Sequence, residues 1–175
     1  SMHVAAAEIT RCVLERDDKV RILDADALNI IAGEHIDYKG SREGQSIITP
    51  HIMEMSRLTG KTVADIKEHM IQSAKEYAIQ HSCICILKDA RTVVTDGQKV
   101  YINCTGNDGM STGGCGDVLT GLIAGMTAMG LDAFEAACLS VYVHGKAGDY
   151  AASGKGRAGM TAADVSEAIA YVLKR

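Results

Sequence analysis

Asn103-Cys-Thr-Gly-Asn-Asp-Gly-Met-Ser-Thr-Gly-Gly-Cys-Gly-Asp117 runs directly into the apolar segment Val118-Leu-Thr-Gly-Leu-Ile-Ala-Gly-Met126. Five glycines followed by an apolar run predict a loop that leads into the first turn of a helix. Glycine allows positive φ and lets an oxygen-rich ligand approach the main chain. The first amides of a helix lack intrahelical acceptors and lie at its positive end, so we expect an anion site at Gly114, Cys115 and Gly116.

Asp117 is the unusual residue of this stretch, because a carboxylate stands where a phosphate is expected to bind. A base that removes a proton from a hydroxyl held beside the phosphate would explain it. An acidic residue in the first turn of a helix is also a common partner of the helix dipole. The short Gly-x-Gly-Asp element at residues 114–117 alone favours the dipole interpretation.

The composition of the 175-residue chain is that of an ordinary globular protein, with 47% hydrophobic and 23% charged residues. A net charge of −4, one Phe and no Trp argue against a nucleic-acid partner. No apolar run is long enough to span a bilayer, so we expect no membrane partner. The six cysteines form no paired CxxC framework, which predicts free thiols, no zinc site and a cytoplasmic location.

The rest of the chain alternates strand-like and helix-like segments. Short apolar or β-branched runs predict strands at 20–23, 46–49 and 83–87, and a hairpin of 92–95 and 99–102 around a two-residue Asp96-Gly97 turn. Apolar spacing and capping residues predict helices at 3–16, 26–31, 50–58, 63–81, 118–129 and 133–152, and one starting at Thr161. This order predicts the α/β class, with a mostly parallel sheet in a single domain over residues 3–175.

Two predicted strands end in polar residues that are candidates for a site, because ligands of parallel sheets gather at the carboxyl ends of strands. Asp24 and Asp26 follow the first strand, where either is functional or caps the next helix. His51 follows the strand at 46–49 and Pro50, the only proline of the chain. A single histidine in this position is more often a capping or surface group than a ligand-binding one.

The full string Asn-x-Thr-Gly-Asn-x-Gly-Met-Ser-Thr-Gly-Gly-x-Gly-Asp-Val-Leu-Thr-Gly at 103–121 is long and specific. It resembles the signature of the ADP/ATP-dependent NAD(P)H-hydrate dehydratases, which belong to the ribokinase-like superfamily. The resemblance covers roughly residues 20–165 and includes four further phrases. They are Asp-Ala-Asp-Ala-Leu-Asn at 24–29, Thr-Pro-His-x-x-Glu at 49–54 with Met53 at a glycine position, Lys88 to Thr92 with Asp89 at a glycine position, and His-Gly-x-Ala-Gly-Asp at 144–149. For most residues of the last phrase, close helix packing through small side chains is the better interpretation.

The resemblance implies a layered α/β/α ribokinase-like domain and the repair of hydrated NADH or NADPH, with ADP or ATP and Mg²⁺ as cofactors. It implies that Asp117 acts as the catalytic base and contacts the substrate together with His51. It places the nucleotide at Lys88, Asp89, Ala90, Arg91, Thr92 and Gly116. Asn107 is a candidate for ordering the metal through water.

Two other functions remain open from the sequence. A ribokinase-like kinase for a vitamin or sugar alcohol would use the same phosphate site and base, although the Asn-x-Thr-Gly-Asn and Thr-Pro-His phrases favour the dehydratase. A nucleotide-binding module without catalysis is the third hypothesis, because family members carry further βα units upstream of the region that this chain matches. We therefore expect an N-terminally truncated domain, whose uncovered sheet edge or face favours a homo-oligomer.

Overall fold

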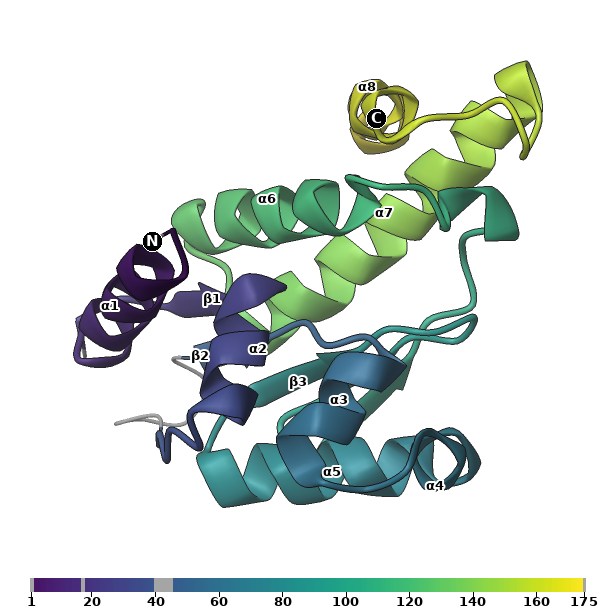
Figure 1. Cartoon of the computed structure of the whole chain (residues 1–175). Coiled ribbons are helices and arrows are strands. Elements are labelled where there is room, and N and C mark those ends of the chain that lie inside the picture. The colour runs from purple at the N-terminus through teal and green to yellow at the C-terminus, as the bar shows by residue number, and fades with distance from the viewer. Residues whose placement is uncertain (1, 17, 40–45, 175) are drawn as a thin grey trace. The chain divides into compact units, whose positions relative to one another are not determined.

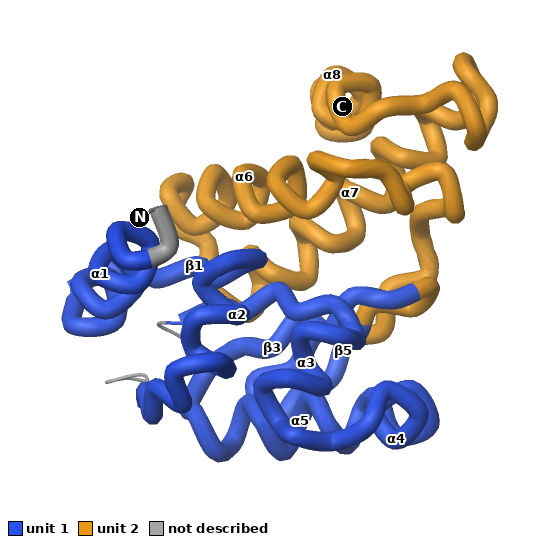
Figure 2. Tube along the Cα trace, in the orientation of Figure 1, with its two compact units in different colours: residues 1–89, 93–101 blue, residues 90–92, 102–175 orange. Residues whose placement is uncertain are grey.

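The computed structural model describes residues 2–16, 18–39 and 46–174, and it divides the chain into two compact units (Figure 1, Figure 2). Unit 1 comprises residues 1–89 and 93–101, and unit 2 comprises residues 90–92 and 102–175. No helix among the described residues is both long and apolar enough to cross a membrane.

The strands form one five-stranded sheet in the order β1-β2-β3-β4-β5. These strands are β1 (Arg21–Leu23), β2 (Ser46–Ile48), β3 (Ile84–Leu87), β4 (Val93–Thr95) and β5 (Val100–Ile102). The pairs β1–β2 and β2–β3 are parallel, whereas β3–β4 is antiparallel. The predicted α/β class with a mostly parallel sheet is therefore confirmed.

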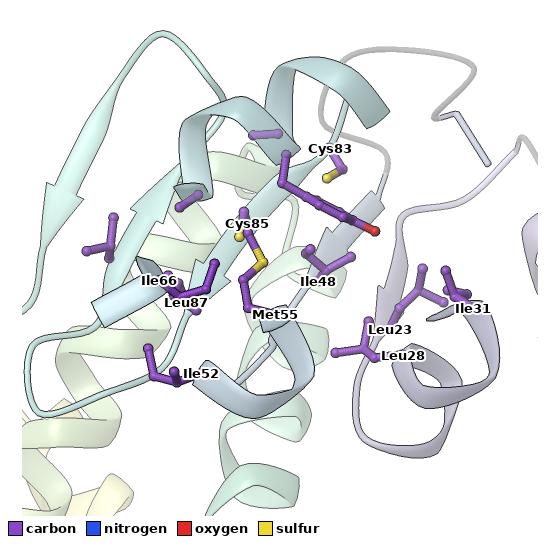
Figure 3. Close-up of a cluster of buried hydrophobic side chains, with 14 of the residues drawn as sticks. Leu23, Leu28, Ile31, Ile48, Ile52, Met55, Ile66, Cys83, Cys85 and Leu87 are labelled. Atoms are coloured by element: carbon purple, nitrogen blue, oxygen red, sulfur yellow. The ribbon is translucent and has the colours of Figure 1, made fainter. Parts of the chain in front are cut away.

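The helices of unit 1 bury one face of this sheet in a single core (Figure 3). They are α1 (Met2–Leu14), α2 (Asp26–Gly33), α3 (Ile52–Thr59), α4 (Val63–Glu68) and α5 (Met70–His81). Leu23, Ile48 and Leu87 project from the strands into a cluster that also contains Met55 of α3 and Ile66 of α4. Because side chains alternate along a strand, this packing fixes which strand residues face the helices.

Unit 2 is helical and contains the glycine-rich stretch. It consists of the 3-10 turn η1 (Asp108–Met110) and the helices α6 (Cys115–Ala128), α7 (Ala133–Lys155) and α8 (Ala162–Leu173). The helix α7 packs against both α6 and α8, and Cys115, Ala147 and Val165 share a buried cluster. Asp132 caps α7 and Thr161 caps α8 in a capping box with Asp164, as the sequence predicts.

Two element predictions in unit 1 are wrong in detail. The segment 63–81 is not one helix, because His69 (φ −125°, ψ 42°) leaves the helical conformation and separates α4 from α5. The connection between β4 and β5 covers residues 96–99 instead of two residues. It is wider because the Asp96 carboxylate accepts hydrogen bonds from the amides of both Gln98 and Lys99, at 2.8 and 2.7 Å.

The start of α2 also differs from its prediction. Ala25, at φ 48°, is the N-cap residue and provides no side-chain hydrogen bond to the helix. Asp26 lies inside the first turn. Asp24 therefore does not cap this helix, and its carboxylate binds elsewhere.

Candidate active site

The glycine-rich loop of unit 2 begins at a buried asparagine that is tied to the predicted nucleotide segment. The amide of Asn103 donates to the carbonyl of Thr92 at 2.9 Å. Its side-chain amide then holds the next turn, because Nδ2 donates to the Thr105 carbonyl at 2.9 Å and Oδ1 accepts from the Thr105 hydroxyl at 2.9 Å. These hydrogen bonds attach the start of the loop to Thr92 and fix the path of the chain from Asn103 to Thr105.

The helix α7 anchors the middle of the loop through a carboxylate. Asp149 accepts hydrogen bonds from the amide of Gly106 at 3.1 Å and from Asn107 Nδ2 at 3.2 Å. Asn107 Oδ1 accepts from the amide of Gly109 at 3.0 Å and so caps η1. One acidic side chain therefore fixes two successive turns of the loop.

The loop enters α6 through Gly114, whose φ of 91° is available to glycine without strain. The first intrahelical hydrogen bond runs from Val118 N to the Gly114 carbonyl at 3.1 Å, and Cys115 N donates to the Thr112 carbonyl at 3.4 Å. The amides of Gly116 and Asp117 precede any intrahelical acceptor. They form an N-terminal site of the kind that binds anions.

Asp117 projects from the first turn of α6 and is exposed. Within the described residues its carboxylate has neither a hydrogen bond nor an ion pair, so it is available to accept a proton. Cys115 is different, since its side chain is buried in the unit 2 core and burial raises the pKa of its thiol. Its contribution to the predicted anion site is limited to its backbone.

In unit 1, polar and charged residues that follow the neighbouring strands β1, β2 and β3 lie close together. The Lys88 ammonium lies 3.0 Å from Asp24 Oδ1, and both side chains are largely buried, at 23% and 12% exposed. The Lys88 amide donates to the Pro50 carbonyl at 2.8 Å, and His51 forms a parallel bridge with Lys88. Asp24 is therefore the partner of a predicted nucleotide-binding lysine.

His51 is the N-cap of α3, with its side chain 50% exposed. Its Nδ1 accepts from the amides of Met53 and Glu54 at 3.1 and 3.2 Å. Met53 lies within the regular part of α3 and not among the residues with positive φ. The methionine at the family's glycine position is thus compatible with the local backbone.

The remaining predicted nucleotide-binding residues are accessible. Asp89, Ala90 and Arg91 are exposed between β3 and β4, and Thr92 is half-buried. His51, Lys88 and Asp89 belong to unit 1, whereas Ala90 to Thr92, Asn107 and Gly114 to Asp117 belong to unit 2.

Comparison with known proteins connects these features to one family. The sequence profile described as NAD(P)H-hydrate dehydratase matches residues 2–171. The chain belongs to the NAD(P)H-hydrate dehydratase family. It is 44% identical over 172 residues to the bifunctional NAD(P)H-hydrate repair enzyme of Moorella thermoacetica, a match that covers 97% of this chain and 32% of that protein.

Solved structures of similar proteins confirm the predicted fold. The ADP/ATP-dependent NAD(P)H-hydrate dehydratase from Bacillus subtilis, co-crystallised with ATP/Mg²⁺, is similar with a TM-score of 0.80 at 33% identity, over 91% of this chain and 56% of that one. A ribokinase-like superfamily protein from Enterococcus faecalis is similar with a TM-score of 0.82 at 25% identity, over 95% and 57% of the two chains. The chain thus has a ribokinase-like fold and spans between about a third and three fifths of the length of these relatives.

The structure gives a role to two residues of the NAD(P)H-hydrate dehydratase phrases. Asp149 belongs to a phrase whose pattern indicates helix packing, yet it holds the glycine-rich loop. Glu54 is 5% exposed and contacts His51. The signal for Glu54 was present in the sequence, because a glutamate three residues after a helix start is typical of a capping box. Nothing local in the sequence indicates the contacts of Asp149, which join residues 42 and 43 positions apart.

Proposed function

We propose that this chain catalyses the ADP- or ATP-dependent dehydration of hydrated NADH and NADPH. The observation that carries this proposal is the first turn of α6, where the Asp117 carboxylate, which has no partner among the described residues, adjoins the open amides of Gly116 and Asp117. A phosphate site with a base beside it suits transfer of a phosphoryl group to a hydroxyl. Membership of the NAD(P)H-hydrate dehydratase family supports the hydrated nicotinamide as the owner of that hydroxyl.

The proposed reaction has two steps. The ring hydroxyl oxygen forms a bond to the terminal phosphorus of the nucleotide as the bridging P–O bond breaks, and Asp117 takes the hydroxyl proton. The ring C–O bond then breaks, phosphate leaves with its bonding electrons, and loss of a proton from the neighbouring ring carbon restores the double bond. The amides at the start of α6 stabilise the charge that develops on the moving phosphoryl group.

We assign the residues from Lys88 to Thr92 to the nucleotide. The Lys88 ammonium is held in place by Asp24, and because an ammonium has three N–H donors it can also donate to a phosphate oxygen. The Thr92 carbonyl positions Asn103 at the start of the glycine-rich loop, so the nucleotide segment and the anion loop of unit 2 are connected by a hydrogen bond.

The residues present fit a Mg²⁺ ion that is carried mainly by the nucleotide. Within the described residues, no three His, Cys, Asp or Glu side chains come together to hold a metal ion. Both polar atoms of the Asn107 side chain are already hydrogen-bonded, so Asn107 would order the ion through water. When bound together with the nucleotide, Mg²⁺ would neutralise part of the charge of the transferred group.

Turnover of hydrated NADH tests this proposal. The chain is incubated with hydrated NADH, Mg²⁺ and either ADP or ATP, and the return of NADH absorbance is followed. We expect NADH to appear only when nucleotide is present. The kinase hypothesis predicts instead that nucleotide is consumed with a vitamin or sugar alcohol, and that hydrated NADH remains unchanged.

Nucleotide binding is expected to raise the thermal stability of the chain whether or not it catalyses dehydration. A ligand at about 100 times its dissociation constant stabilises the native state by about 2.7 kcal/mol. For a chain of this size that corresponds to an increase of roughly 5 to 10 °C in Tm. A thermal melt with and without Mg²⁺ and ADP or ATP measures it. A shift without turnover supports the non-catalytic module, and no shift at millimolar nucleotide contradicts the assigned nucleotide site.

We also propose that the chain forms a homo-oligomer. The strand β5 lies at one edge of the sheet, and its residues Val100 and Ile102 are 39% and 44% exposed. An apolar edge strand of this kind favours pairing with a second copy. Light scattering measures the mass in solution, and a monomer would contradict the proposal.

A further inference from the structure

The cap of α3 fixes the protonation pattern of the His51 ring. A ring nitrogen that accepts hydrogen bonds cannot carry a proton, and Nδ1 accepts from the amides of Met53 and Glu54. The neutral ring therefore has its proton on Nε2. The same two bonds orient the ring, whose one donor is then Nε2–H, and half of the side-chain surface is exposed.

Glu54 completes this arrangement from a buried position. Its side chain is 6% exposed, and its Oε2 accepts from the His51 amide at 2.8 Å. Its Oε1 lies 3.5 Å from His51 Nε2, which is too long for a hydrogen bond of good geometry. At this distance the negative carboxylate still favours a proton on Nε2 over a lone pair on Nε2. Glu54 thus holds the backbone of His51 and, like the two amides that bind Nδ1, favours the tautomer with the proton on Nε2.

We infer that Glu54 is a positioning residue, which holds His51 with Nδ1 turned to the helix, so that Nε2–H is the hydrogen-bond donor that the ring offers to the substrate. This inference rests on the proposed function and deepens it, since it states which kind of substrate atom His51 meets. A donor requires an acceptor, so the contacted group is a carbonyl, hydroxyl or phosphate oxygen of the hydrated dinucleotide and not its carboxamide N–H₂.

Capping alone does not require this pair of side chains. The other side-chain caps of the described helices α4, α7 and α8 are Thr62, Asp132 and Thr161, residue types that are common at this position. Histidine has a bulkier ring, half of which is exposed here. In addition, Nδ1 and Glu54 occupy the amides of residues 51, 53 and 54, so the start of α3 is not an anion site of its own.

A double-mutant cycle tests the inference. In His51→Asn the asparagine oxygen preserves the cap, whereas the Nε2–H of the ring is lost. We expect the KM for hydrated NADH to rise about 3- to 10-fold, with the KM for nucleotide and the Tm nearly unchanged. Glu54→Ala is expected to raise the same KM by a similar factor, and the double variant should be no worse than His51→Asn alone. Glu54→Gln, whose amide oxygen can still accept from the His51 amide, should restore the KM to within about twofold of wild type.

A second measurement does not depend on turnover. Nitrogen NMR shifts of the unliganded wild-type protein report which ring nitrogen of His51 carries the proton, and we expect Nε2. A proton on Nδ1 at neutral pH overturns the inference, as does a Glu54→Ala effect on KM that is equally large in the His51→Asn background. A wild-type chain that neither binds nor converts hydrated NADH overturns the proposed function itself, whereas normal turnover with an additive cycle overturns only the role of Glu54.

Discussion

Asp117→Asn is expected to lower the kcat for dehydration of hydrated NADH by about 10²- to 10⁴-fold, the usual contribution of a general base. The asparagine side chain has nearly the same shape but cannot accept the proton of the ring hydroxyl. Because Asp117 is exposed and has no hydrogen bond or ion pair to another described residue, its replacement removes no contact of the fold. We therefore expect the nucleotide-induced increase in Tm to survive. Single-turnover kinetics and a thermal melt of the same variant measure the two effects.

Glu135→Gln is the matched control for Asp117→Asn. Glu135 is also an exposed acid in the first turn of a helix, α7, and lies outside the glycine-rich loop. Loss of the helix-dipole interaction costs each variant about 0.3 to 1 kcal/mol of stability. If Asp117 were only a dipole partner, the two variants would lose similar stability and both would keep their activity. Retention of most of the activity by Asp117→Asn contradicts its assignment as the base.

Elements with a local cause could be predicted from the sequence. The caps at Thr62, Asp132 and Thr161 follow from side chains that satisfy amides two or three residues away. The entry into α6 follows in the same way from the glycines before it. The break at His69 could not be predicted, because the apolar spacing continues through it from Ile66 to Met70 and no glycine or proline interrupts the pattern.

The contacts that shape the candidate site are mostly long-range, and for that reason the sequence alone did not reveal them. The sequence allows Asp24 either a function or a helix cap; it does not cap α2, and it pairs with Lys88, which is 64 positions away. The small residues of the phrase at 144–149 indicate close helix packing, which describes only part of what this phrase does. Gly145 does permit close packing, but Asp149 one turn later holds the loop by hydrogen bonds. Periodicity identifies which face of a helix is buried and does not identify what lies against it.

Gly145 is a position where the helix α7 approaches the glycine-rich loop of unit 2 closely. A Cβ built there would lie 2.1 Å from Thr105 Oγ1 and 2.7 Å from the Thr105 carbonyl carbon. The backbone of Thr105 cannot turn aside as a flexible side chain can, and the single proton of Thr105 Oγ1 is shared between Asn103 Oδ1 and the Tyr142 carbonyl, at 2.9 and 3.0 Å. An added methyl group must therefore push the helix and the loop apart.

Gly145→Ala is expected to destabilise the chain by about 1 to 3 kcal/mol, the usual cost of overpacking a tight contact. At roughly 2 to 4 °C per kcal/mol for this chain length, the Tm falls by several degrees. Gly125→Ala in α6 is the matched control, because nothing lies within 4 Å of its Cβ and alanine is favoured over glycine inside a helix. We expect this control to be neutral or slightly stabilising. Displacing Thr105 also moves the turn that Asp149 holds at Gly106, so Gly145→Ala should reduce the nucleotide-induced increase in Tm as well. Equal melting curves for the two variants, with and without nucleotide, would show that α7 does not position the loop.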